Sequence, residues 1–230
     1  MTTIHTQTSF AGRDRALATR IATTPGVVQR GVTIFDGTMR FPLKPLYLEN
    51  VYGDPDLLAE LARHGALAAG AVCADVIVGA ESAGIPLATA IGMTAQLPSA
   101  FVRKPGYRGH VPDEPGTRGA DILGKRVLFV DDAIWRGDSF VGFADRIATA
   151  GGILVGAYCL VDMRPLAPDR WAGGGPLGSS VLYAPSSYDD ILDAVAENDL
   201  LSPKFITLVR RCISEQWADD DPRWTLLDAA

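Results

Sequence analysis

The chain has 230 residues, 47% of them hydrophobic and 21% charged, which is the composition of an ordinary globular protein with a buried core. The net charge of −6 and the lack of a Lys/Arg block argue against a nucleic-acid partner, and no apolar stretch is long enough to span a membrane. Three widely spaced cysteines and a polar N-terminus without a visible secretory signal lead us to expect a cytoplasmic protein.

The N-terminal part of the chain predicts local elements with packing roles. Residues 13–22 show a weak amphipathic helical pattern. Residues 31–37 and 41–48 predict two short strands around an Asp-Gly turn. Asp54 and Pro55 then begin a helix, because Asp is a favoured N-cap residue and Pro fits the first helical position.

The β-branched residues 76–79 predict a buried strand that runs into a turn rich in Gly, Ala and Ser. A helix follows from about Pro86. Small residues let backbone amides approach a ligand closely, as anion-binding loops require. Taken alone, this pattern fits either such a loop or a generic strand-to-helix turn.

Residues 100–103 predict a short strand that delivers Arg103 and Lys104 to a long polar segment. This segment is rich in Gly and Pro and reaches about Gly124. A loop of that length without periodicity is a functional lid, a disordered segment or a solvated basic loop.

The apolar residues 127–130 end in two adjacent carboxylates, Asp131 and Asp132. A turn at Gly137 leads into a helical run, 139–150, which Ser139 is able to cap. A strand that opens into a helix N-terminus is an anion site in α/β folds. Carboxylates beside it suit a ligand with phosphates and hydroxyls, or phosphates with Mg²⁺. The alternative is an acidic strand end without a ligand.

The C-terminal part predicts another buried strand at 153–161, an edge strand at 181–183, a helix at 188–197 capped by Ser187, and a helical run at 205–213. Strand signals and helical runs therefore alternate along the chain. We expect an α/β fold with a doubly wound parallel sheet and helices on both faces.

The acidic pair with its loop resembles the ribose-phosphate signature of type I phosphoribosyltransferases, and the Gly-Ile-Pro-Leu-Ala run at 84–88 is typical of the orotate branch. The resemblance implies that Asp131 and Asp132 hold the ribose hydroxyls of phosphoribosyl pyrophosphate (PRPP) and bind Mg²⁺ together with Glu81. The implied loop for the 5′-phosphate consists of Ala133, Ile134, Trp135, Arg136, Gly137, Asp138 and Ser139. The implied loop for the pyrophosphate consists of Ala80, Glu81, Ser82, Ala83 and Gly84.

The phosphate loop departs from the family pattern. Trp135 and Arg136 stand where the family has one or two Thr, and Asp138 stands where a small or neutral residue is common. A carboxylate about 4 Å from a phosphate costs on the order of 4 kcal/mol per charge pair near a surface. Asp138 therefore points away from the ligand, or Arg136 offsets it, or phosphate binding is weakened.

The resemblance also assigns a lid and a base pocket. Arg103 and Lys104 match the basic pair of the mobile loop, which in the family acts partly in the partner subunit of a dimer, so a homodimer is implied. Arg108 keeps a positive charge but cannot give up a proton, and His110 matches only with one inserted residue. The resemblance also assigns Arg164, at the rim of the site, to the orotate carboxylate. It assigns Lys44, in the hood, to a contact with a carboxylate or the base. Ordinary surface ion pairs or an exposed edge lysine explain both equally well.

The resemblance covers roughly residues 30–200 and implies transfer of ribose-5-phosphate from PRPP to orotate or a related anionic base, with release of pyrophosphate. We expect one domain over 1–230, with hood elements from about 25 to 50 and a C-terminal extension from about 203. Two alternatives remain: a phosphoribosyltransferase for another base, and a non-catalytic protein of the same fold that senses PRPP or a nucleotide.

Overall fold

The computed structural model describes residues 13–29, 33–35, 39–41, 46–104, 116–166, 171, 175, 177–178, 180–218 and 220–228. Its centre is a six-stranded sheet with the strand order β10-β8-β6-β3-β4-β5. The strands are β3 (Val76–Ala80), β4 (Ser99–Val102), β5 (Thr117–Gly119), β6 (Arg126–Val130), β8 (Ile153–Tyr158) and β10 (Val181–Tyr183). All neighbours pair in parallel except β5, which is antiparallel to β4. The polar segment that we expected to run as a loop to about Gly124 therefore ends in a strand.

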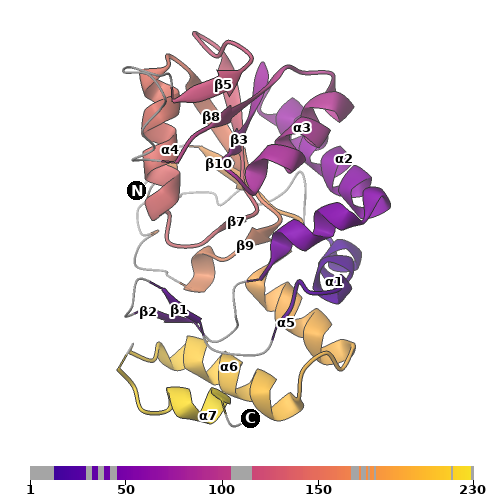
Figure 1. Cartoon of the computed structure of the whole chain (residues 1–230), viewed down its shortest axis with the longest axis vertical. Coiled ribbons are helices and arrows are strands. Elements are labelled where there is room, and N and C mark those ends of the chain that lie inside the picture. The colour runs from indigo at the N-terminus through magenta and orange to yellow at the C-terminus, as the bar shows by residue number, and fades with distance from the viewer. Residues whose placement is uncertain are drawn as a thin grey trace, which may run out of the picture.

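Helices cover both faces of this sheet, which confirms the predicted doubly wound arrangement (Figure 1). Helices α2 (Pro55–Ala71) and α3 (Gly84–Ala95) pack on one face, and α4 (Asp138–Thr149) packs on the other. Strands β3 and β6 are buried on both sides: Leu128 belongs to the core under α2 and α3, whereas Phe129 belongs to the core under α4. This double burial explains why their sequences are continuously apolar.

A second, smaller parallel sheet lies past the ends of the main strands. It consists of β7 (Ala133–Ile134), β9 (Val161–Asp162) and β11 (Ser186–Ser187). The single strand expected at 153–161 is thus broken after Tyr158. There the Cys159 N–H donates to the Tyr183 carbonyl, but the Leu160 N–H donates to the Asp132 carbonyl, so the chain changes partners between the two residues.

The N-terminal region is built from α1 (Arg15–Thr23), the antiparallel strands β1 (Thr33–Phe35) and β2 (Met39–Phe41), and the 3₁₀ helix η1 (Leu48–Gly53). The second hood strand, expected at 41–48, lies earlier than predicted. Asp54 caps α2 as predicted, because its carboxylate accepts from the N–H groups of Asp56 and Leu57. Ser187 likewise caps α5 (Tyr188–Glu197) in a reciprocal arrangement with Asp190.

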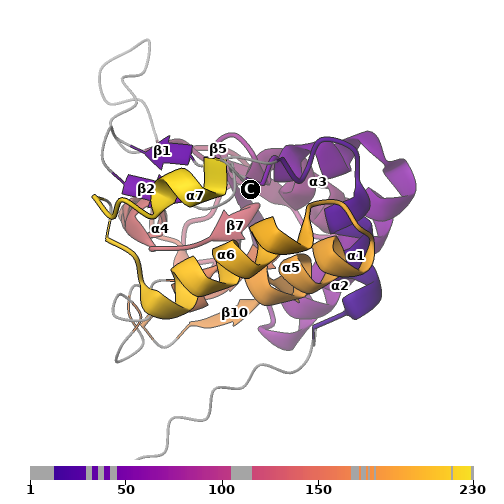
Figure 2. The ribbon, with the colours of Figure 1, turned by 90° about the horizontal axis from the view of Figure 1, so that it is seen from below.

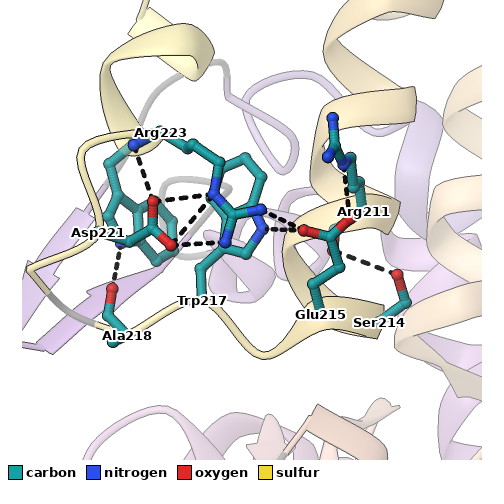
Figure 3. Close-up of polar contacts among 8 residues, drawn as sticks. Arg211, Ser214, Glu215, Trp217, Ala218, Asp221 and Arg223 are labelled. Atoms are coloured by element: carbon teal, nitrogen blue, oxygen red, sulfur yellow. Dashed lines mark hydrogen bonds and ion pairs between the residues drawn. The ribbon is translucent and has the colours of Figure 1, made fainter.

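The C-terminal helices α6 (Pro203–Glu215) and α7 (Trp224–Asp228) lie beside the hairpin β1-β2 in both views (Figures 1 and 2). Trp217 and Trp224 meet edge to face, and the Arg223 guanidinium lies over the Trp217 ring. Arg223 also pairs with Asp221 and Glu215 (Figure 3). Both tryptophans belong to the core under α1 and α2. The extension therefore packs on the body of the protein.

Within the described residues, every helix is too short or too polar to cross a bilayer. The division into one domain with a hood and an extension stays a prediction.

Candidate active site

The two sequence motifs meet in one pocket at the carboxyl ends of β3 and β6. These strands are neighbours, with Gly79 opposite Val130, so the turns that follow them emerge side by side. The pocket has a volume of about 470 Å³. Its lining consists of Glu49, Glu81, Ser82, Ala83, Lys104, Asp131, Asp132, Ala133, Ile134, Trp135, Arg136, Gly137, Asp138, Ser139, Phe140 and Phe143. The structure therefore brings together most of the residues that the sequence assigns to the site.

A glycine allows the two turns to approach this closely. A Cβ on Gly84 would lie 2.2 Å from the Val130 carbonyl oxygen and 3.2 Å from Asp131 Cα. These atoms belong to the backbone and cannot move aside as a side chain does. Any larger residue at position 84 would push the start of α3 away from the acidic pair.

The acidic pair is buried at the end of β6. Asp131 continues the strand by donating its N–H to the Tyr158 carbonyl at 3.0 Å. Its carboxylate accepts the Asp132 N–H at 3.0 Å, and the Asp132 carboxylate accepts the Ala133 N–H at 2.8 Å. Burial and the adjacent charge of Asp132 raise the pKa of Asp131 well above its usual value, and burial also raises the pKa of Asp132. The pair therefore offers buried carboxylate oxygens, which accept hydrogen bonds from hydroxyl groups and, when ionised, attract positive charge.

The turn after β3 is fixed by three groups around Glu81. The Glu81 carboxylate accepts from Arg103 Nη1 at 3.1 Å and from the Lys104 N–H at 2.9 Å, and its own N–H donates to Val102. The Glu81–Ser82 peptide is cis. The Tyr52 hydroxyl donates to the Ala83 carbonyl at 2.6 Å. Lys104 lines the pocket, whereas Arg103 lies behind Glu81 with its guanidinium over the Phe101 ring.

The turn after β6 places the N-terminus of α4 in the pocket. Gly137 has φ +82°, a left-handed conformation that glycine adopts without strain, and it is the N-cap of α4. The sequence predicted Ser139 as the N-cap, and this prediction was wrong. Ser139 lies inside the first turn of the helix. Arg136 Nε lies 3.4 Å from Asp138 Oδ2, so Arg136 offsets the charge of Asp138. This is one of the three arrangements that the sequence left open.

The other assigned residues are not among those that line the pocket, or they lie outside the described part of the chain. Ala80 ends β3, and Arg164 begins the 3₁₀ helix η2 (Arg164–Leu166) after β9. Asp162 accepts from Nε and Nη2 of Arg164 at 2.9 and 2.8 Å, and the guanidinium lies over the Trp171 ring. Lys44, Arg108 and His110 lie outside the described residues.

Four residues of the site carry no sequence signal that we recognised. Glu49 lines the pocket from η1, and Tyr52 reaches the turn after β3 from the same short helix. Phe140 and Phe143 line the pocket from α4, but their i, i+3 spacing reads as core packing, and both are almost completely buried. Nothing in the sequence around η1 marks it as part of a site.

The pocket carries too much negative charge to bind a phosphate group that comes without a cation. Among its described lining residues, carboxylates occur at Glu49, Glu81, Asp131, Asp132 and Asp138, and cationic groups at Lys104 and Arg136. The charge of Glu49 raises the pKa of Asp132 further, after burial. A phosphorylated ligand therefore fits best when it brings a cation. Asp131 and Asp132 suit Mg²⁺, which prefers one or two carboxylates together with phosphate oxygens and water.

The described residues contain no cluster of three His, Cys, Asp or Glu side chains that would hold a metal ion alone. Both oxygens of Glu81 already accept hydrogen bonds, which favours contact with Mg²⁺ through water over direct ligation.

Comparisons with known proteins agree with this geometry. Residues 57–170 match the model of the phosphoribosyl transferase domain family. The orotate phosphoribosyltransferase of Pyrobaculum islandicum is 33% identical over 141 residues, which cover 60% of this chain and 69% of that protein. The corresponding protein of Pyrobaculum calidifontis is 30% identical over 60% of this chain and 70% of its own length.

Solved structures show the same fold. A structure of Leishmania donovani UMP synthase has a TM-score of 0.72 and 21% identity, and the match covers 90% of this chain but 43% of that one. A Mycobacterium tuberculosis orotate phosphoribosyltransferase in complex with PRPP has a TM-score of 0.55 and 19% identity over 77% of this chain and 90% of that one. Together, the sequence relatives and the paired loops show that the chain belongs to the phosphoribosyltransferase family, in its orotate phosphoribosyltransferase branch.

Proposed function

We propose that the protein transfers ribose-5-phosphate from PRPP to orotate and releases pyrophosphate, a step of pyrimidine nucleotide synthesis. The observation that carries the proposal is the shared pocket of the acidic pair, the turn after β3 and the loop 133–139. One ligand with hydroxyls between two phosphate groups satisfies all three parts at once. The choice of orotate as the acceptor base is supported by the sequence relatives, which are orotate phosphoribosyltransferases.

Asp131 and Asp132 hold the two ribose hydroxyls in this proposal. Bond breaking at the anomeric carbon leaves positive charge on the ribose ring. Two buried carboxylates beside the ring favour that charge, and they need no reorganisation when it develops. Holding the ring also fixes the anomeric carbon between the leaving pyrophosphate and the incoming base nitrogen.

The leaving pyrophosphate is bound by the turn 80–84 and by Lys104. Small residues expose the backbone of this turn, and the N-terminus of α3 adds a positive dipole end. Bound Mg²⁺ would neutralise phosphate charge, with Asp131 and Asp132 as its protein ligands and Glu81 linked through water. We also assign Arg108 and His110, which lie outside the described residues, to the same pyrophosphate, where a lid would exclude water from the reacting centre.

The loop 133–139 is assigned to the 5′-phosphate, with backbone N–H groups at the start of α4 as donors. Arg136 adds a cation that the usual Thr does not provide, and Asp138 holds it at the pocket. Arg164 is assigned to the carboxylate of the anionic base. Asp162 fixes the guanidinium through Nε and Nη2, and we assign Nη1 to the ligand. In the hood, Lys44 is assigned to a contact with a carboxylate or with the base.

A homodimer in the cytoplasm completes the proposal. Helix α3 contains no charged residue, and Met93 on it is 78% exposed, which supports contact with a second copy. Cys73, Cys159 and Cys212 are free thiols, which suits a reducing compartment. Light scattering tests the dimer: a molar mass of a single chain at micromolar concentration contradicts it.

A panel of nucleobases incubated with PRPP and Mg²⁺, with pyrophosphate release as the readout, tests the reaction. The proposal predicts release with orotate and little with uracil, hypoxanthine, guanine or adenine. Release with another base alone would indicate a different acceptor, and tight PRPP binding without release would indicate a sensing protein. Asp131→Asn with Asp132→Asn serves as the inactive control.

A further inference from the structure

A tryptophan outside the pocket holds the backbone of the phosphate loop. The indole N–H of Trp171 donates to the Trp135 carbonyl oxygen at 2.6 Å. Trp135 lines the pocket, whereas Trp171 does not. The two residues are 36 positions apart, so this contact ties the loop after β6 to the segment that follows η2.

Trp171 is itself held in place. The guanidinium of Arg164 lies over its ring, 5.6 Å from the ring centre, and Asp162 fixes that guanidinium with two hydrogen bonds. Asp162 belongs to β9, which pairs with β7 in the loop itself, with Ile134 opposite Asp162. The Met163 N–H donates to the Ile134 carbonyl at 2.9 Å. The residues that hold Trp171 therefore belong to the same pair of strands, β7 and β9, as the loop that Trp171 contacts.

The orientation of one peptide unit follows from this contact. In a planar trans peptide, the carbonyl of one residue and the N–H of the next point in opposite directions. The Trp135 carbonyl is engaged by Trp171, which does not line the pocket. We therefore expect the Arg136 N–H on the opposite side of this peptide, toward the pocket. The reverse orientation would present a carbonyl oxygen to a phosphate and remove one donor.

We infer that Trp171 is a positioning residue that sets the peptide between Trp135 and Arg136 so that its N–H faces the anion in the loop 133–139. The identity of that anion as the 5′-phosphate of PRPP rests on the proposed function. Arg164 and Asp162 act indirectly, because they fix the ring of Trp171.

The variant Trp171→Phe tests this directly, because it removes the indole N–H and keeps an aromatic ring for Arg164. Trp224→Phe is the matched control: Trp224 Nε1 also donates to a backbone carbonyl, that of Ala218, at 2.8 Å, but in the C-terminal extension. Two readouts are measured, PRPP affinity by calorimetry with Mg²⁺ and amide hydrogen exchange of a peptide covering 133–139. Steady-state kinetics with orotate then show whether the substitution changes KM for PRPP or kcat.

Trp171→Phe should weaken PRPP binding and speed exchange in the loop, each by roughly 2- to 10-fold, the effect of one hydrogen bond. It should raise KM for PRPP more than it lowers kcat. Trp224→Phe should leave all of these values near those of the wild type. Unchanged loop exchange in Trp171→Phe would overturn the inference. If the wild type binds PRPP, an unchanged PRPP affinity in Trp171→Phe would also overturn it. If the wild type neither binds PRPP nor turns over orotate, the proposed function fails, and loop exchange alone decides the role of Trp171.

Discussion

The hydroxyl of Tyr52 donates a hydrogen bond to the carbonyl oxygen of Ala83, with 2.6 Å between the oxygens. This contact joins η1, just before α2, to the turn that we assign to pyrophosphate. Burial, with smaller contributions from Asp132 and Asp131, raises the pKa of Tyr52 far above its usual value. The phenol therefore stays protonated and remains a donor at any physiological pH.

Replacing Tyr52 by Phe should weaken the pyrophosphate turn without unfolding the protein. The change removes one hydrogen bond and leaves the Ala83 carbonyl without that donor, so we expect a loss of about 1 kcal/mol in the free energy of unfolding. KM for PRPP should rise by roughly 2- to 10-fold. Urea denaturation and steady-state kinetics measure these two effects. Tyr47→Phe, at a 40% exposed site, is the control; equal effects of the two substitutions would contradict a role for the Tyr52 hydroxyl.

Substitution of both acidic residues should abolish catalysis. Asp131→Asn with Asp132→Asn removes the two negative charges assigned to the ribose, and pyrophosphate release should fall by roughly 10³-fold or more. Turnover retained within tenfold of the wild type would refute the role of the pair. Circular dichroism establishes that the variant is folded.

The same pair should lower the stability of the unliganded protein at neutral pH. The pKa of Asp131 is raised above its usual value of 3.8 by burial and by Asp132, so the folded state binds this proton more tightly than the unfolded state. The resulting stabilisation is present below pH 3.8 and is lost as the pH rises through the folded-state pKa. Asp131→Asn should therefore be more stable than the wild type at pH 7.5, by a margin that shrinks toward pH 4. Denaturation across this range, with the exposed Asp121→Asn as control, measures the margin; a variant less stable at pH 7.5 contradicts the account.

The ion pair between Arg103 and Glu81 should matter for PRPP binding even though Arg103 does not line the pocket. The side chains are 19% and 24% exposed, so Arg103→Met leaves a partly buried carboxylate beside the pyrophosphate turn. We expect a loss of about 1–2 kcal/mol in stability and weaker PRPP binding. Glu81→Gln combined with Arg103→Met should recover part of the affinity, because the opposing charge is gone. A double variant no better than Arg103→Met would contradict this explanation by charge.

The C-terminal extension offers a test by titration. Hydrogen bonds from Arg211, Trp217 and Arg223 lower the pKa of Glu215 to about 2 (Figure 3). Its contribution to stability is present above the usual value of 4.5 and is lost as the pH falls through about 2. Carboxyl NMR should find this low pKa, and Arg211→Gln should raise it. A value near 4.5 in the wild type would contradict the network.

The sequence predicted those parts of the structure that depend on local pattern. The strand that ends at Asp131 and the cap at Asp54 both follow from spacing and capping chemistry, and the structure contains both. Ser139 was misplaced because a Gly in the left-handed conformation served as the N-cap two residues earlier. The strand break after Tyr158 escaped prediction because it depends on hydrogen-bond partners at Asp132 and Tyr183, not on hydrophobicity.

Contacts between distant segments were beyond local patterns. Tyr52 and Ala83 are 31 positions apart, and Trp171 and Trp135 are 36 apart. Each pair meets through the tertiary arrangement of elements that are distant in the sequence. The site was therefore predictable where its residues follow a strand, and unpredictable where a side chain reaches it from another segment.

The most direct measurement is a crystal structure of the protein with PRPP and Mg²⁺. Our account predicts the ribose hydroxyls at Asp131 and Asp132, the 5′-phosphate in the loop 133–139 and the pyrophosphate at the turn 80–84. Density for the sugar elsewhere, or a bound sugar that leaves either turn empty, would contradict it.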